Sequence, residues 1–244
     1  MRFEDVQARR AADAGAEPAP SLRTPVRGLL LDFGAVISVS LFECHRQTEQ
    51  LLGLPRGTLT WLGPLDPSTD PLWQSMLRQE ISERDYWAVR AREVGEAVGQ
   101  RGWDTRAMLA RVRHTDPVHT VRPLVARLIG AARAAGLRVG ILSNELELFY
   151  GTAFLERMDV LRGLDAVVDA THTGILKPDP RAYAMAAERL ALPAAQILFV
   201  DDQFRNIAGA VDAGMQVQFF DLRDVPGNVA AVAARLGLPC EEWR

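Results

Sequence analysis

The chain has 244 residues, 48% of them hydrophobic and 24% charged, with a formal net charge of −3. These values describe an ordinary globular protein of one or two domains and exclude a disordered chain. The charge offers no basic field for binding nucleic acid, and no apolar run reaches the ~18 residues that a membrane span requires.

Residues 1–25 begin the chain with a segment rich in alanine and mixed charges. The segment lacks the apolar centre of a signal peptide. Four acidic residues argue against a transit peptide, because such peptides are poor in acids. We therefore expect a mobile N-terminal extension with little role in the fold.

The first strong structural signal is the segment VRGLLLDFGAVIS at 26–38. Val26 and the three leucines 29–31 form a short apolar run without alternation. Such a run is typical of a strand that is buried on both faces of a parallel sheet. The run ends at Asp32, and Gly34 interrupts it further.

The next segment, 40–118, has helical character. Three stretches carry helical periodicity, at 41–53, 70–79 and 83–95. Ser82 followed by Asp85 indicates a capping box. Four of the five tryptophans fall here and are expected to form a small core, with one or two facing a substrate pocket: Trp61, Trp73, Trp87 and Trp103. We predict a small α-helical subdomain over 40–118, inserted after the first strand.

Buried strands and amphipathic helices alternate through the rest of the chain. Strands are predicted at 137–144, 165–170, 196–200 and 215–220, and helices at 121–136, 180–191, 204–214 and 226–236. Gly136 and Gly214 are expected to end helices, and Asp179-Pro180 to begin one. Short links between strands and helices indicate crossover units. The predicted fold is therefore α/β, with a doubly wound, Rossmann-like parallel sheet formed by 26–39 and 119–244.

Polar residues gather where the predicted strands end, and ligands of open parallel sheets bind at that edge. The residues at this rim are Asp32, Ser143, Asn144, Lys177, Asp201 and Asp202. Each alone has an ordinary interpretation as a turn, cap or surface residue. Three carboxylates at one rim would repel each other unless a cation lay between them. Hard oxygen ligands in this number suit Mg²⁺, which also takes a substrate phosphate oxygen.

Four segments along the chain resemble the four motifs of the haloacid dehalogenase-like (HAD) hydrolase superfamily. They are LLLDFGAVIS, ILSN, GILKPDP and ILFVDDQFRN, in that order, and the resemblance covers about residues 26–222. The KPDP and FVDD stretches are similar to those of its phosphatase-rich subfamily. The helical segment lies where that subfamily carries a cap.

The resemblance implies a role for each motif residue. Asp32 would attack phosphorus and form an aspartyl-phosphate that water then hydrolyses. Ser143 would donate a hydrogen bond to a phosphoryl oxygen, with Asn144 beside it in the substrate site. Lys177 would contact substrate and act as a point charge that also holds Asp32 ionised.

The resemblance also implies a set of metal ligands. Asp32 and Asp202 would bind Mg²⁺ directly, and Asp201 would bind it directly or through a water. The backbone carbonyl of Gly34 would be a further ligand. Asn206, one helical turn beyond Asp202, would orient that loop.

Gly34 departs from the family pattern, in which a second aspartate usually stands two residues after the nucleophile. That aspartate protonates the leaving group, and its loss typically costs about 10²–10⁴ in rate. An acid from the start of the insert is one replacement, with Glu43, His45 and Glu49 as candidates. His172 near the predicted rim is interpreted first as a turn residue, and His114 and His119 receive no role.

The leading hypothesis is a Mg²⁺-dependent phosphatase of a small phosphorylated metabolite, with no nucleic-acid or membrane partner. One alternative is a non-catalytic, regulatory HAD-fold binding module, for which Gly34 would mark the lost acid. A 2-haloacid dehalogenase is less favoured, because Asp201-Asp202 indicates a metal. The absence of lysine between 38 and 120 argues against a phosphonate hydrolase. The two distant cysteines, Cys44 and Cys240, fit neither a disulfide framework nor a zinc site and favour a reducing, cytoplasmic compartment.

Overall fold

The computed structural model describes residues 24–112, 119–239 and 243. Most of the predicted extension therefore lies outside the described residues, as do His114 and Cys240. The five strands form one parallel sheet in the order β3-β2-β1-β4-β5. They are β1 Gly28–Leu31, β2 Arg138–Ser143, β3 Ala166–Asp169, β4 Ile197–Asp201 and β5 Gln216–Phe219. The predicted doubly wound parallel sheet is confirmed, with β1 at its centre.

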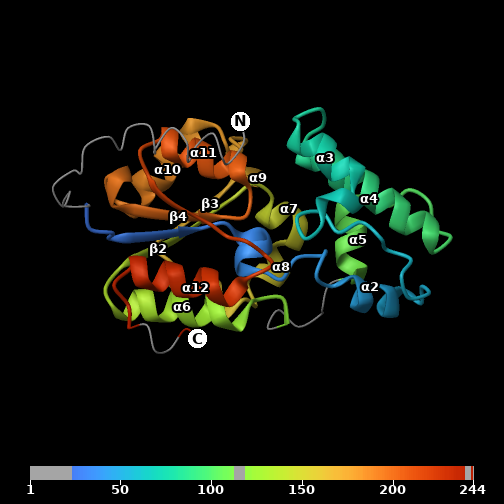
Figure 1. Ribbon diagram of the computed structural model, residues 1–244, viewed down its shortest axis with the longest axis horizontal. Coiled ribbons are helices and arrows are strands. Elements are labelled where there is room, and N and C mark those ends of the chain that lie inside the picture. Colours follow the sequence, from blue (N-terminus) through green and yellow to red (C-terminus); the bar gives the residue numbers. More distant parts are fainter. Residues whose placement is uncertain (1–23, 113–118, 240–242, 244) are drawn as a thin grey trace.

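Two layers of helices cover the sheet (Figure 1). One face carries α6 Pro123–Ala134 and α12 Val225–Arg235, and the other carries α10 Pro180–Leu190 and α11 Phe204–Asp212. Successive side chains of β1 point to opposite layers, because a strand alternates its side chains. Leu29 and Leu31 accordingly pack with α6 and α12, whereas Leu30 packs with α10 and α11. Burial on both faces explains the unbroken apolar run of this strand.

The predicted ends of these elements agree with the structure to within two residues. Asp179 caps α10, because its side chain accepts the backbone N–H of Arg181 at 2.9 Å. Gly136 follows α6 with a positive φ of 79°, which glycine adopts without steric cost. Three short helices between the strands were not predicted: α7 Leu146–Tyr150, α8 Thr152–Leu155 and α9 Ala170–Thr173. Single 3₁₀ turns lie at Pro67–Thr69, Asp159–Leu161 and Ala194–Gln196.

The helical insert lies to one side of the sheet (Figure 1). It contains α2 His45–Leu52, α3 Pro71–Leu77, α4 Glu83–Ala97 and α5 Thr105–Val112. Ser82 and Asp85 form the predicted capping box, with Ser82 Oγ accepting the Asp85 N–H at 3.1 Å. The four tryptophans belong to one apolar cluster of the insert. The sequence prediction missed α5, although Asp104 caps it by accepting the Ala107 N–H at 2.7 Å.

The chain leaves the sheet for the insert and returns along neighbouring paths. Ser38 and Val121 form an antiparallel bridge, and the Val39 N–H donates to Thr120 O at 2.8 Å. The apolar cluster of the insert is separate from the two clusters that flank the sheet. We therefore propose that residues 40–118 form a cap domain on a core of 26–39 and 119–244. Within the described residues, no helix is both long and apolar enough to span a membrane.

Candidate active site

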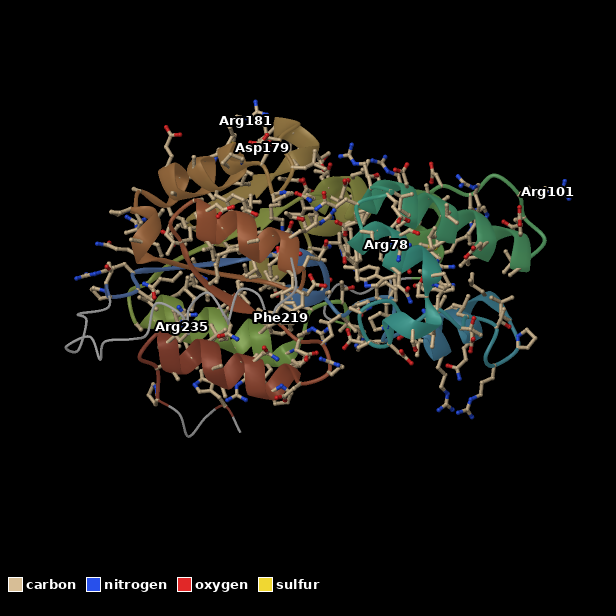
Figure 2. The ribbon with its side chains drawn as sticks, turned by 45° about the horizontal axis from the view of Figure 1, so that its top comes forward. Arg78, Arg101, Asp179, Arg181, Phe219 and Arg235 are labelled. Carbon is tan, nitrogen blue, oxygen red and sulfur yellow. The ribbon has the colours of Figure 1, made fainter. Side chains whose placement is uncertain are left out.

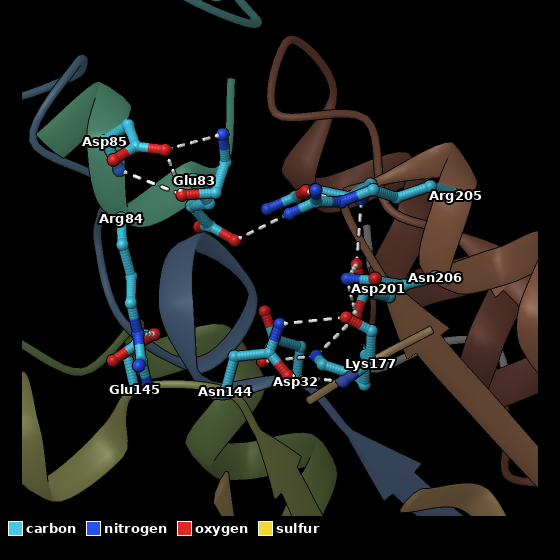
Figure 3. A network of polar contacts seen from close by, with 12 residues as sticks. Asp32, Glu83, Arg84, Asp85, Asn144, Glu145, Lys177, Asp201, Arg205 and Asn206 are labelled. Carbon is cyan, nitrogen blue, oxygen red and sulfur yellow. Dashed lines mark hydrogen bonds and ion pairs between the residues drawn. The ribbon is translucent and has the colours of Figure 1, made fainter. Parts of the chain in front are cut away.

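Lys177 joins two of the predicted rim carboxylates. Its Nζ lies 2.8 Å from Asp32 Oδ1 and 2.6 Å from Asp201 Oδ2 (Figure 3). Asp32 follows β1 and Asp201 ends β4, so the parallel pairing of these strands brings the two carboxylates together. The exposed fraction of the Lys177 side chain is only 2%. Although burial alone would lower the pKa of Lys177, the charges of Asp201 and Asp32 raise it above its usual value.

Asn144 holds the backbone of Lys177 in place. The Lys177 N–H donates to Asn144 Oδ1 at 2.6 Å, and Asn144 Nδ2 donates to Lys177 O at 3.2 Å. Asn144 therefore positions the lysine, and the substrate contact expected of it from the sequence stays a prediction. Ser143 is buried beside it, and its Oγ accepts the Glu145 N–H at 3.4 Å. A hydroxyl that accepts there still has its own hydrogen to donate to a ligand.

Asp201 is fixed by further donors. Its Oδ1 accepts the Gln203 N–H at 2.8 Å, and Asn206 Nδ2 lies 3.0 and 3.1 Å from its two oxygens. Asn206 thus orients the Asp201 carboxylate directly. Both oxygens of Asp201 already have protein donors. Its neighbour Asp202, which is less buried, could bind a metal directly.

The rim has an excess of negative charge. Asp32, Asp201 and Asp202 each offer an oxygen within 4.8 Å of the others, and Lys177 is the cation in contact with them. Burial raises the pKa of Asp32 to about 7, with Lys177 lowering it and Asp201 raising it. Burial and the charge of Asp201 also raise the pKa of Asp202. The expectation that Mg²⁺ and Lys177 together hold Asp32 ionised stays a prediction, in which burial of Asp32 opposes the charge of Lys177.

These residues fit a divalent cation, because three carboxylates with hard oxygen atoms meet and Lys177 offsets only part of their negative charge. Gly34 lies in the tight turn Phe33–Ile37 that follows Asp32. A Cβ added at Gly34 would approach only Asp32 Oδ2, at 3.9 Å, and the backbone φ of −62° suits any residue. The position of the usual second aspartate is therefore open space beside the nucleophile.

A cavity of about 140 Å³ extends from the rim to the helical insert. Asp32, Gly34 and Asp202 line its core side, and Trp73 and Trp87 line its insert side. The insert is tied to the core across this cavity by two ion pairs (Figure 3). They join Glu83 to Arg205 at 2.9 Å and Arg84 to Glu145.

The acids expected from the start of the insert do not line this cavity. Glu43 pairs with Arg122 and accepts hydrogen bonds from Ser40. Glu49 is buried and accepts the Leu59 N–H at 2.9 Å. The contacts with Arg122 and Leu59 were not visible as a pattern in sequence, because these partners lie 79 and 10 positions away.

His45 is likewise part of the insert core, with its ring centroid 4.3 Å from that of Trp61. Burial lowers its pKa, so the ring stays neutral. We expect a His45→Phe variant to keep kcat/KM for phosphate monoesters within about twofold of the parent, because the ring is used for packing. Steady-state kinetics check this, and a loss above about tenfold would restore His45 as the acid.

The lining residues that sequence reasoning missed include two with ionisable side chains, Glu83 and His119. Glu83 begins α4 directly after the Ser82 cap, but nothing in the sequence indicates that this turn faces Asp32. His119 had been given no role. His172, by contrast, is an exposed residue of the short helix α9 that pairs with Glu147 at 2.8 Å and does not line the cavity.

Comparisons with known proteins agree with this architecture. The family model for haloacid dehalogenase-like hydrolase matches residues 57–214. Phosphatase MT3486 of Mycobacterium tuberculosis is 37% identical over 192 residues, which cover 77% of this chain and 83% of that protein. Acyl-CoA dehydrogenase family member 10 of Mus musculus is 32% identical over 117 residues, but this match spans only 11% of that protein and 48% of the chain.

A solved structure shows the same fold at low sequence identity. The L-2-haloacid dehalogenase RSc1362 superposes with a TM-score of 0.55 at 22% identity, covering 81% of this chain and 87% of that one. The family match covers more than half of the chain, and the Mycobacterium relative is similar along most of its length. The chain therefore belongs to the haloacid dehalogenase-like hydrolase family and is a hydrolase.

Proposed function

We propose that this hydrolase is a Mg²⁺-dependent phosphatase of a small phosphate monoester, with Asp32 as its nucleophile. The observation that carries the proposal is the buried contact of Asp32 with Lys177 at 2.8 Å, beside the oxygens of Asp202. A carboxylate nucleophile needs neighbouring positive charge to approach an anionic phosphoryl group. The phosphatase-named relative from Mycobacterium supports the same reading.

Each rim residue has a distinct task in the proposed reaction. The Asp32 carboxylate attacks phosphorus, the ester oxygen departs with its bonding electrons, and water then hydrolyses the aspartyl-phosphate. Ser143 donates its hydroxyl hydrogen to a phosphoryl oxygen, and Lys177 offsets the negative charge of the phosphoryl group. Asn144 keeps Lys177 in position. Asp32 and Asp202, with Asp201 behind them and the carbonyl of Gly34 as a further candidate, would hold Mg²⁺, which supplies charge stabilisation when bound.

The other readings fit the rim less well. A 2-haloacid dehalogenase does not require the excess of negative charge that Asp201 and Asp202 create. A regulatory binding module would not require Asp32, Ser143 and Lys177 together. A panel of phosphate monoesters assayed with Mg²⁺ tests the proposal. Turnover supports it, whereas chloride release from a 2-haloacid in EDTA, without phosphatase activity, would replace it by the dehalogenase.

Metal binding makes a prediction about stability. Mg²⁺ at 100 times its Kd should raise the free energy of unfolding by about 2.7 kcal/mol, because it binds only the folded rim. We expect this gain to vanish in Asp202→Asn, which removes a ligand charge. Thermal unfolding with and without Mg²⁺ measures the effect.

The matched control for this prediction is Asp212→Asn, since Asp212 is an exposed aspartate at the end of α11. It should retain the full Mg²⁺-dependent gain. An equal gain in Asp202→Asn would show that the metal binds elsewhere.

A further inference from the structure

We propose that the enzyme prefers aryl phosphate monoesters, with an uncharged single ring as the leaving group. This inference rests on the proposed phosphatase function and names its substrate class. Three features carry it: the walls of the cavity, the distribution of charge around it, and the open position at Gly34.

The walls of the cavity are mostly apolar and aromatic. The insert contributes Phe42, Trp73, Trp87 and Leu109, and the core contributes Phe149. Aromatic rings pack well against such side chains through edge-to-face and offset contacts. The volume of about 140 Å³ is close to that of an apolar cavity of about 150 Å³ that binds benzene. The whole cavity, which includes the space beside Asp32 and Asp202, is therefore on the scale of one small ring.

Lysine and arginine are absent from the described part of the same walls, which leaves out 113–118, and His119 is its one basic side chain. The lining carboxylates are Asp32, Glu83 and Asp202. A leaving group that carried its own carboxylate would meet these charges without a partner, which costs free energy.

The nearest cations of the insert and the rim already have partners. Arg205 pairs with Glu83, Arg84 pairs with Glu145, and Lys177 is held between two aspartates. Arg78 of the insert is exposed and pairs with Glu80, and Arg101 lies at the end of the insert that is far from the sheet (Figure 2). The charges of the described walls thus favour a neutral leaving group.

Gly34 adds an independent reason for a phenolic leaving group. A phenol has a pKa near ~10, as in the tyrosine side chain, so a phenolate departs without being protonated first. An alkyl alkoxide is a far stronger base and depends on a general acid. Because position 34 carries no acid and only Asp32 lies within 4 Å of a Cβ there, the site is suited to the phenolate.

The first test compares three esters at pH 8 with Mg²⁺. Phenyl phosphate has the expected ring, cyclohexyl phosphate has a similar size but a poor leaving group, and phosphoglycolate has an anionic one. We expect kcat/KM for phenyl phosphate to exceed that for either of the others by about 100-fold. Comparable values for phenyl phosphate and phosphoglycolate would overturn the inference and leave the phosphatase function intact. No turnover of any monoester would overturn both.

The second test places an arginine in the cavity. Gln47 of α2 lines the cavity, whereas Gln50 of the same helix is exposed and does not. Gln47→Arg should raise the ratio of kcat/KM for phosphoglycolate to that for phenyl phosphate by about tenfold, since it supplies the missing cation. Gln50→Arg should leave the ratio unchanged. An unchanged ratio in Gln47→Arg would contradict the cavity as the site of the leaving group.

The third test restores an acid beside Asp32. Gly34→Asp should raise kcat/KM for cyclohexyl phosphate by about 10- to 100-fold over Gly34→Ala, and it should raise the value for phenyl phosphate much less. The alanine variant controls for the added Cβ, which the turn accommodates. Equal gains on both esters would show that protonation of the leaving group is not what Gly34 lacks.

Discussion

Replacing Asp32 by asparagine is expected to lower kcat for phenyl phosphate by about 10⁴-fold or more. The amide oxygen is a poor nucleophile and cannot form the aspartyl-phosphate. Burial raises the pKa of Asp32 to about 7, so the neutral amide removes a charge that is costly to bury and should not unfold the protein. Lys177 retains Asp201 as its partner. The lost activity should therefore be separable from stability.

The measurements are initial rates with Mg²⁺ and urea unfolding of the same samples. Mass spectrometry after acid quenching should detect one phosphoryl group on the Asp32 peptide of the parent and none on the variant. Asp179→Asn is the matched control, because Asp179 is an exposed cap of α10 and asparagine caps a helix equally well. Parent-level turnover by Asp32→Asn, or a phosphorylated variant, would show that another residue is the nucleophile.

The sheet could be predicted from the sequence because its signals are local. The run that ends at Asp32 is apolar on both faces, and only a central parallel strand has that environment. Helix ends such as Asp179 and Gly136 follow from backbone chemistry that involves a few neighbouring residues. The residues of the rim could then be predicted from the strands, since the carboxyl ends of parallel strands meet at one edge.

The contacts around the rim could not be predicted in the same way. The placement of Glu83 opposite Asp32 depends on how the insert docks, which involves Arg205 some 122 positions away. The role of Asn144 depends on a pair of hydrogen bonds across 33 positions. The acids proposed at Glu43, His45 and Glu49 were chosen by proximity in sequence, and the structure uses these side chains for packing and for fixing the insert. Local patterns thus identify the rim, whereas docking determines the cavity.

Lys177 supports both the fold and the proposed chemistry, and it is the only lysine in the chain. Replacing it by methionine would leave the buried carboxylates of Asp32 and Asp201 without their cation. Breaking a buried ion pair in this way typically costs about 3–5 kcal/mol. We expect that loss in the free energy of unfolding, measured in urea with EDTA at pH 8. We also expect loss of turnover, because the charge beside the nucleophile is gone.

A double-mutant cycle distinguishes this cost from a simple loss of packing. Adding Asp201→Asn to Lys177→Met removes the buried negative charge that Lys177→Met leaves without a partner. The double variant should therefore recover roughly half of the lost free energy of unfolding, although Asp201→Asn alone is destabilising. Full additivity of the two changes would contradict the coupling seen in the 2.6 Å contact.

In the parent, selective ¹⁵N labelling of lysine should give a single ammonium signal that shifts when Mg²⁺ is added. If Mg²⁺ does not shift this signal, the metal binds away from Lys177. It would then also bind away from Asp32, because Lys177 contacts Asp32.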